Sequence, residues 1–199
     1  MTGGSRRSDA PDPKGLAGRR TGDQPAPGER AREICLRLLA VRPRTRAELA
    51  TALRRRGVPD DVVSEVLDRY GDIGIVDDRA FAQAWVTSRH HGRGLAGRTL
   101  AGELRRKGVD SGTVDDAVGE LDPATQEATA RTLVARGLRA ESGRAPAAVF
   151  RRLVGMLARK GYPAALAYRV VKDALGQHPA TAEFADGIDP DAVDGEVTP

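Results

Sequence analysis

Gly92, Gly94 and Gly97 have the G-x-G-x-x-G spacing found in many dinucleotide-binding loops. In such loops the glycines let the backbone approach the phosphates, and the loop leads from a strand into the N-terminus of a helix. The residues before Gly92 have the apolar spacing of a helix rather than of a strand. We therefore expect no dinucleotide site, and we interpret the three glycines as a flexible joint between two helices.

Histidine, cysteine and acidic residues show no spacing typical of a metal or catalytic site. His90 and His91 are adjacent, so they point to different faces of a helix and cannot form the i, i+4 pair of a helical metal site. We expect both at the surface or at a helix end. Cys35 is the only cysteine, which excludes an internal disulfide and fits a reducing compartment. With no Walker loop and no Ser/His/Asp set, the sequence predicts a protein that is not an enzyme and holds no cofactor or metal.

Clusters of basic residues carry the clearest chemistry, because guanidinium and ammonium groups bind phosphates and carboxylates. Three similar segments each hold such a cluster at the same place: Arg54, Arg55 and Arg56; Arg105, Arg106 and Lys107; Arg159 and Lys160. One alternative is that these cations only complement the negative end of a helix dipole, which gains about 0.3–1 kcal/mol each. That explains one cation per helix better than three. We therefore predict that these eight residues bind a partner with regularly spaced negative charge.

The net positive charge is concentrated in the middle of the chain. Residues 31–175 hold 26 basic and 18 acidic side chains, a net charge of +8, whereas residues 176–199 hold six acidic side chains and no Lys or Arg. A basic surface attracts phosphates or acidic protein faces without selecting between them. Compositional drift in an Arg-rich proteome remains the alternative explanation.

The basic clusters belong to an internal repeat. In its three copies the cluster is followed directly by Gly57, Gly108 or Gly161, and these glycines are 51 and 53 residues apart. In each copy two leucines lie four residues apart, which places both on one helix face. These pairs are Leu49 and Leu53, Leu100 and Leu104, and Leu153 and Leu157. Each glycine suits the positive φ that ends a helix, and a second helix then begins near Pro59, Asp110 or Pro163.

A further amphipathic segment precedes each pair of helices, at residues 31–41, 79–89 and 123–139. Thr45 and Glu48 have the spacing of a capping box, and Asp122 marks another helix start. The sequence thus predicts an all-α fold of three tandem three-helix, helix-turn-helix-like units, at residues 31–74, 75–121 and 122–175. One such unit buries little apolar surface, so we expect the units to pack on one another in an elongated, curved body, with Ile73, Ile75 and Val76 at the first junction.

The two ends of the chain have the composition of disordered segments. Residues 1–30 are rich in Gly, Pro, Ser and Arg, and residues 176–199 are acidic and rich in Pro, Ala and Gly, so we predict a disordered basic arm and a disordered acidic tail. No apolar run approaches the roughly 20 residues of a membrane span. We expect a cytoplasmic protein with no membrane segment.

Phe81 and Trp85 lie four residues apart and are predicted to pack in a core. They begin a segment that resembles the signature of the RecX family. The matching residues are Asp78-Arg79-Ala80-Phe81-Ala82, Trp85-Val86, Arg89, Gly92 to Gly97, Leu100, Glu103-Leu104 and Lys107-Gly108-Val109.

The RecX resemblance implies a regulator of homologous recombination and DNA repair. Such a protein lies in the groove of the RecA filament on single-stranded DNA and limits filament extension, ATP hydrolysis and strand exchange; weak direct binding of DNA is a further expectation. We expect it to act as a monomer. The competing interpretation is a helix-turn-helix transcription regulator, although such proteins usually carry one reading head and dimerise, whereas this chain repeats its unit in tandem.

Overall fold

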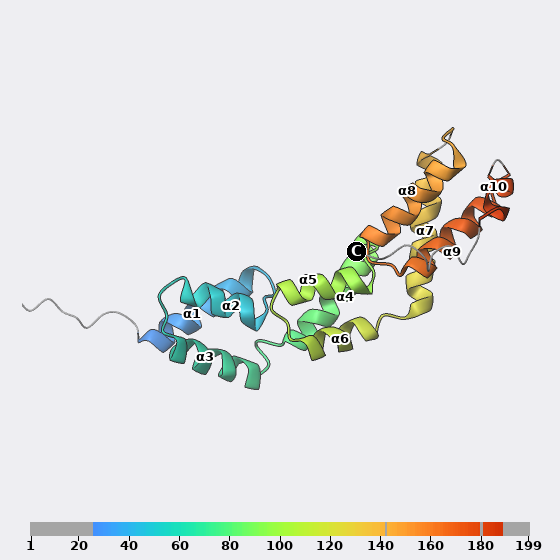
Figure 1. Cartoon of the computed structure of the whole chain (residues 1–199). Helices are drawn as coiled ribbons and strands as arrows, with labels where there is room; N and C mark the ends of the chain where they lie inside the picture. Colours follow the sequence, from blue (N-terminus) through green and yellow to red (C-terminus); the bar gives the residue numbers. More distant parts are fainter. Residues whose placement is uncertain (1–25, 142, 180, 189–199) are drawn as a thin grey trace, which may run out of the picture.

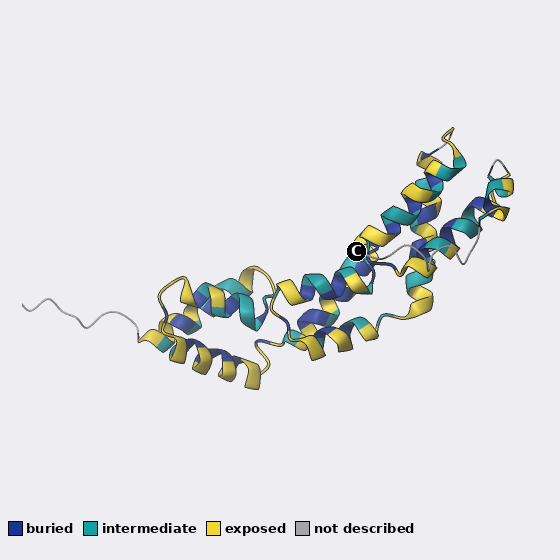
Figure 2. Ribbon diagram, viewed as in Figure 1, coloured by how far each residue is buried: buried dark blue, intermediate teal, exposed yellow. Residues whose placement is uncertain are grey.

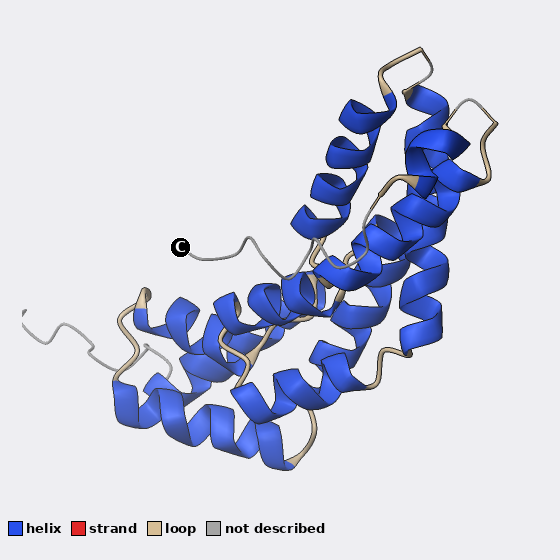
Figure 3. Ribbon diagram, turned by 45° about the vertical axis from the view of Figure 1, so that its right-hand side comes forward, coloured by secondary structure: helices blue, strands red, loops and turns tan. Residues whose placement is uncertain are grey.

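The protein, seen here as a computed structural model, is described over residues 26–141, 143–179 and 181–188, and this part of the chain is helical with no strands (Figures 1 and 3). The all-α prediction is therefore confirmed. In chain order the helices are α1 (Pro27–Val41), α2 (Arg46–Arg54), α3 (Asp60–Asp72), α4 (Asp78–Arg93), α5 (Gly97–Arg106), α6 (Ser111–Gly119), α7 (Pro123–Ala140), α8 (Pro146–Arg159), α9 (Ala164–Gly176) and α10 (Ala182–Asp186).

The helices pack in three successive sets along an elongated, bent body (Figure 1). Helices α1 to α3 contact one another, as do α4 to α6 and α7 to α9, and α10 packs on α9. Each set encloses a group of buried apolar residues, and the group of unit 3 also includes Ala96 at the start of α5. This grouping is consistent with the three repeats expected from the sequence, and we call the sets units 1, 2 and 3.

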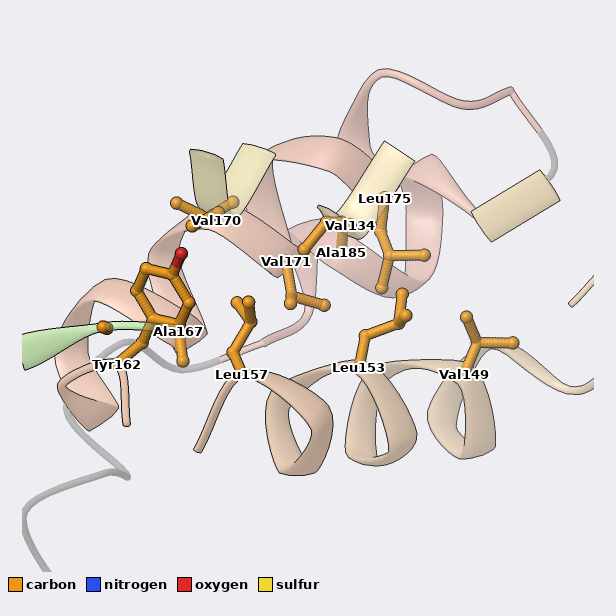
Figure 4. Packing of buried hydrophobic residues seen from close by; sticks show 12 residues of the cluster. Val134, Val149, Leu153, Leu157, Tyr162, Ala167, Val170, Val171, Leu175 and Ala185 are labelled. Carbon is orange, nitrogen blue, oxygen red and sulfur yellow. The ribbon is translucent and has the colours of Figure 1, made fainter. Parts of the chain in front are cut away.

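The six leucines of the repeat form the buried face of the middle helices α2, α5 and α8. Leu153 is 2% exposed and the other five are fully buried, whereas most of the remaining positions on these helices are intermediate or exposed (Figure 2). In unit 3, Leu153 and Leu157 point toward Val171 of the neighbouring α9 (Figure 4). Burial of a leucine side chain stabilises the fold by about 1.5–3 kcal/mol. The i, i+4 pattern therefore predicted the core correctly.

The predicted turn and cap residues occupy the expected positions. Gly57, Gly108 and Gly161 have φ of 74°, 77° and 90°. Pro59, Asp110 and Pro163 are the N-caps of α3, α6 and α9. Thr45 and Glu48 form the capping box of α2, and the Asp122 side chain accepts a hydrogen bond from the backbone N–H of Thr125 at the start of α7.

Helices extend into both of the segments that were predicted to be disordered. Helix α1 begins at Pro27, inside the predicted arm, because proline suits the first helical turn and Ala31 is fully buried. Residues 176–188 include α10, whose Ala185 is 2% exposed and belongs to the core of unit 3. Residues 1–25 and 189–199, where the rest of the predicted tails falls, lie outside the described residues.

The expected residues of the first junction are corrected, and the place of His90 becomes clear. Ile73 and Ile75 are 60% and 42% exposed, and only Val76 is buried, in the core of unit 1, so these residues do not form the first junction. His90 lies in the last turn of α4, a helix end as expected, and is fully buried there, with Nδ1 2.8 Å from the Leu95 carbonyl and Nε2 2.9 Å from the Thr129 hydroxyl. These two polar partners offset the desolvation of its ring.

Candidate functional site

The middle helices of the three units lie end to end in one row, α8 to α5 to α2 (Figure 1). The carbonyl of Lys107, at the C-cap of α5, accepts a hydrogen bond of 2.7 Å from the hydroxyl of Thr45, the N-cap of α2. Likewise the carbonyl of Lys160, at the C-cap of α8, accepts one of 2.8 Å from the backbone N–H of Ala96, the N-cap of α5. The negative end of each helix dipole therefore meets the positive end of the next, which stabilises the row.

The turn glycines are close-packed at both junctions of this row. A Cβ added at Gly108 would lie 2.3 Å from the Cβ of Ala47, and one added at Gly161 would lie 2.5 Å from the Oγ1 of Thr99. Gly57, at the free end of the row, has nothing within 4 Å of that position. Two of the three equivalent glycines are thus needed for the approach of neighbouring units as well as for the turn.

The eight predicted binding residues differ in the contacts that their charged groups make, according to their position in the cluster. In units 1 and 2 the first cation of the cluster forms an ion pair inside its own unit: Arg54 with Asp60 at 2.6 Å and Arg105 with Asp115 at 3.1 Å. Ala158 occupies the corresponding place in unit 3. These two arginines are therefore already partly neutralised.

The third cation of each cluster is held by other atoms of the protein. Arg56 donates to the carbonyl of Ala52 at 2.9 Å, and Lys160 donates to the carbonyl of Arg93 at 2.6 Å. Lys107 donates to Glu48 at 2.9 Å across the first junction, and its side chain is only 18% exposed. Lys107 therefore has little capacity left for a partner, whereas Arg56 and Lys160 each use one donor in these bonds and keep the others.

The second cation of each cluster is the one that remains available. Arg55, Arg106 and Arg159 are exposed, and their guanidinium groups have no ion pair or hydrogen bond with any residue in the described ranges. Arg55 and Arg106 also line one hollow of about 320 Å³ between α2 and the end of α5, together with Arg44. Guanidinium groups gathered in this way can bind a phosphate or carboxylate through paired N–H donors.

A polar network fixes the first junction beneath this hollow. The Lys107 ammonium and the Arg89 guanidinium lie over the ring of Trp85, at 4.4 Å and 4.2 Å from its centroid. The indole N–H of Trp85 donates to Glu103 at 2.8 Å. Burial alone would raise the pKa of Glu48, but hydrogen bonds from Arg42 and Lys107 outweigh it and lower that pKa. Units 1 and 2 are thereby held in one orientation.

The glycine-rich segment is close-packed and is not the flexible joint that we expected. Gly94 ends α4 with φ of 61°, and a Cβ there would lie 2.9 Å from a methyl group of Leu133 in α7. A Cβ at Gly97 would lie 2.9 Å from Val118 in α6. The segment before Gly94 is helical, as predicted, so these glycines serve helix packing and do not form a dinucleotide loop.

Sequence reasoning missed Arg44 and Glu48 as members of the site. It also did not distinguish the first, second and third cations of each cluster by the contacts that they make. The contacts that separate them join residues far apart in the chain, such as Lys107 and Glu48. Among the described residues, no three His, Cys, Asp or Glu side chains are placed to hold a metal ion. None of the helices seen in residues 26–188 has both the length and the apolar character that a bilayer span requires.

Comparison with known proteins agrees with the fold and the repeat. Residues 31–69 match the family model described as RecX, first three-helix domain, and residues 77–118 match RecX, second three-helix domain. The chain is 59% identical over 155 residues to the regulatory protein RecX of Thermobifida fusca, covering 78% of this chain and 84% of that one. It is 58% identical over 149 residues to the regulatory protein RecX of Streptomyces coelicolor, covering 75% of this chain and 79% of that one.

Solved structures show the same fold at much lower identity. The crystal structure of RecX from Lactobacillus salivarius matches with a TM-score of 0.70 at 19% identity, covering 74% of this chain and 96% of that chain. A second crystal structure of regulatory protein RecX matches with a TM-score of 0.67 at 22% identity, covering 74% of this chain and 72% of that chain.

Proposed function

The chain belongs to the RecX family of regulatory proteins, and from this we propose that it regulates homologous recombination and DNA repair. It binds the RecA filament assembled on single-stranded DNA, lies in the filament groove, and inhibits filament extension, ATP hydrolysis and strand exchange. Such a role places the protein in the cytoplasm, acting as a monomer along the filament.

One observation supports this proposal most directly: at the same position in every unit, the row of middle helices carries an arginine that has no ion pair within the described part of the chain. Arg55, Arg106 and Arg159 each stand two residues before the turn glycine, and the junctions fix the units that bear them. A helical filament repeats its surface at regular intervals. Several weak charged contacts made at once by a rigid array add up to firm binding, and that binding weakens as salt rises.

The charges of the third helices in units 1 and 2 disfavour the rival function of a helix-turn-helix transcription regulator, whereas α9 of unit 3 carries two basic residues and one acidic residue. In that architecture the second helix of the pair enters the major groove, which corresponds to α3 in unit 1 and α6 in unit 2. Helix α3 carries five acidic residues and one basic residue, and α6 carries two acidic residues and no basic one. DNA phosphates would repel both helices.

The test is ATP hydrolysis by RecA on single-stranded DNA, measured with increasing amounts of the purified protein. We compare two double variants of equal net charge, R55Q/R106Q and R54Q/R105Q. They alter neighbouring positions in the same two helical turns, but only the second pair is engaged in ion pairs. We expect the wild-type protein to inhibit, and R55Q/R106Q to require about tenfold more protein, a loss of about 1.4 kcal/mol.

Failure of the two parts of the proposal can be told apart. If the wild-type protein leaves ATP hydrolysis unchanged, regulation of RecA is refuted for this chain. If it inhibits but the two double variants weaken it equally, the special role of Arg55 and Arg106 is refuted while the regulatory function stands. A preference for one duplex sequence over random duplexes would favour the transcription regulator.

A further inference from the structure

A second hollow, of about 400 Å³, lies at the junction of units 2 and 3 and has no role in the function proposed above. The C-terminal turn of α4, one face of α7 and the end of α8 line it. Its charged residues are Arg93, Arg136 and Lys160, and its hydroxyl groups are those of Thr129 and Thr132. Only Lys160 of these belongs to the basic clusters singled out in the sequence.

The positive charges around this hollow have no acidic counter-charge among its described lining residues. None of the lining residues is acidic, whereas the first hollow contains Glu48. The guanidinium groups of Arg93 and Arg136 are exposed and have no ion pair or hydrogen bond with any residue that the structure describes. Lys160 uses one N–H for the carbonyl of Arg93 at 2.6 Å, which leaves two donors. Because three cations line one hollow that has no acidic lining residue, the electrostatic potential there is positive and attracts an anion.

The walls of the hollow are fixed rather than adaptable. His90 is fully buried and joins the α4–α5 connection to α7 through Leu95 and Thr129, at 2.8 Å and 2.9 Å. Gly94 is buried and packs directly against Leu133 of α7. The cations therefore stand on a rigid frame, and an anion that binds them does not have to order the backbone first.

We propose that this hollow is a binding site for a phosphate group, supplied by a nucleic-acid strand or by a free polyphosphate anion. The two guanidinium groups and the Lys160 ammonium donate to the phosphate oxygens, since charge-assisted hydrogen bonds of this kind are the strongest that a protein offers to an anion. The volume exceeds the needs of one phosphate and suits a phosphate with part of the group that carries it. The site does not depend on RecA, so it can be tested on the isolated protein.

The test is a titration of the full-length ¹⁵N-labelled protein with sodium pyrophosphate and, separately, with a thymidine hexanucleotide. Amide shifts of Gly92 and Gly94 report on the hollow. The variant R93Q/R136Q removes two of its cations, and the control R69Q/R79Q removes two exposed arginines elsewhere, Arg79 being at the opposite end of α4. We expect at least one titrant to shift both amides, R93Q/R136Q to bind it at least tenfold more weakly than wild type, and the control to stay within about twofold.

Each outcome decides the matter. If the hexanucleotide shifts the same amides, the phosphate comes from a strand; if only pyrophosphate shifts them, the ligand is a free anion. Both results support the site. It is refuted if neither titrant moves the two amides, or if R93Q/R136Q binds as tightly as R69Q/R79Q while both retain the helical circular dichroism of the wild type.

Discussion

Alanine substitution of the turn glycines tests whether the middle helices form a close-packed row. Gly57 and Gly108 occupy the same place in consecutive units and have nearly the same φ, 74° and 77°. They differ in their surroundings, because a Cβ at Gly108 would lie 2.3 Å from the Cβ of Ala47, whereas one at Gly57 would meet nothing within 4 Å. Gly57→Ala is therefore a matched control for Gly108→Ala.

The expected magnitudes follow from two separate costs. A left-handed backbone costs an alanine about 1–2 kcal/mol, and both variants bear this cost. Only Gly108→Ala adds the overlap with Ala47, whose Cβ is fixed to α2 and cannot rotate away; crowding of this kind costs about 1–3 kcal/mol more. We expect losses of about 1–2 kcal/mol for Gly57→Ala and about 2–5 kcal/mol for Gly108→Ala, with about 2–4 °C in Tm for each kcal/mol.

The assay is unfolding in guanidinium chloride, followed by far-ultraviolet circular dichroism and by the fluorescence of Trp85. This single tryptophan lies beneath Lys107, so its fluorescence reports on the first junction. If Gly108→Ala loses no more stability than Gly57→Ala, and Trp85 fluorescence is unchanged, the units do not meet as described. Gly161→Ala provides an independent repeat at the second junction, where the added Cβ would lie 2.6 Å from the backbone nitrogen of Thr99.

Three further predictions concern the junctions. Lys107→Met removes the ion pair with Glu48 and should cost about 1–2 kcal/mol of unfolding free energy, between the values of exposed and buried pairs; an unchanged midpoint in urea would contradict it. Because folding lowers the pKa of Glu48, its ionised carboxylate stabilises the folded state. This stabilisation is complete above the pKa of glutamate in the unfolded chain, about 4.3, and is lost as pH falls through the pKa of Glu48 in the folded protein. Acidification below about pH 4 should therefore change Trp85 fluorescence in the wild type but less in Glu48→Gln; equal changes would refute this. His90→Ala leaves a cavity and unpaired hydrogen-bond partners and should lower the free energy of unfolding by about 2–3 kcal/mol. The control His91→Ala, at an exposed position, should change it by no more than about 0.5 kcal/mol. Thermal unfolding of both variants measures the difference.

Patterns formed by residues close together in the sequence were sufficient to predict the helices and much of each core. The spacing of Leu49 and Leu53, repeated in every unit, placed the buried faces correctly, and Gly57 and Pro59 marked a helix end and the next helix start. These features depend on residues within about one helical turn of one another. The same reasoning was wrong for Ile73 and Ile75, because composition alone does not say whether an apolar residue near a turn is covered.

By itself, the sequence determined that the chain is helical, that its unit recurs, and that each middle helix ends in basic residues. Only the tertiary structure decided which basic residues remain available: Arg54 forms an ion pair with Asp60, Lys107 is held by Glu48 of the preceding unit, and Arg55 is left exposed. The reason is physical. Helix formation depends on neighbours in the chain, whereas the state of a charge depends on every group within a few ångströms, and at the junctions those groups come from residues about 60 positions away.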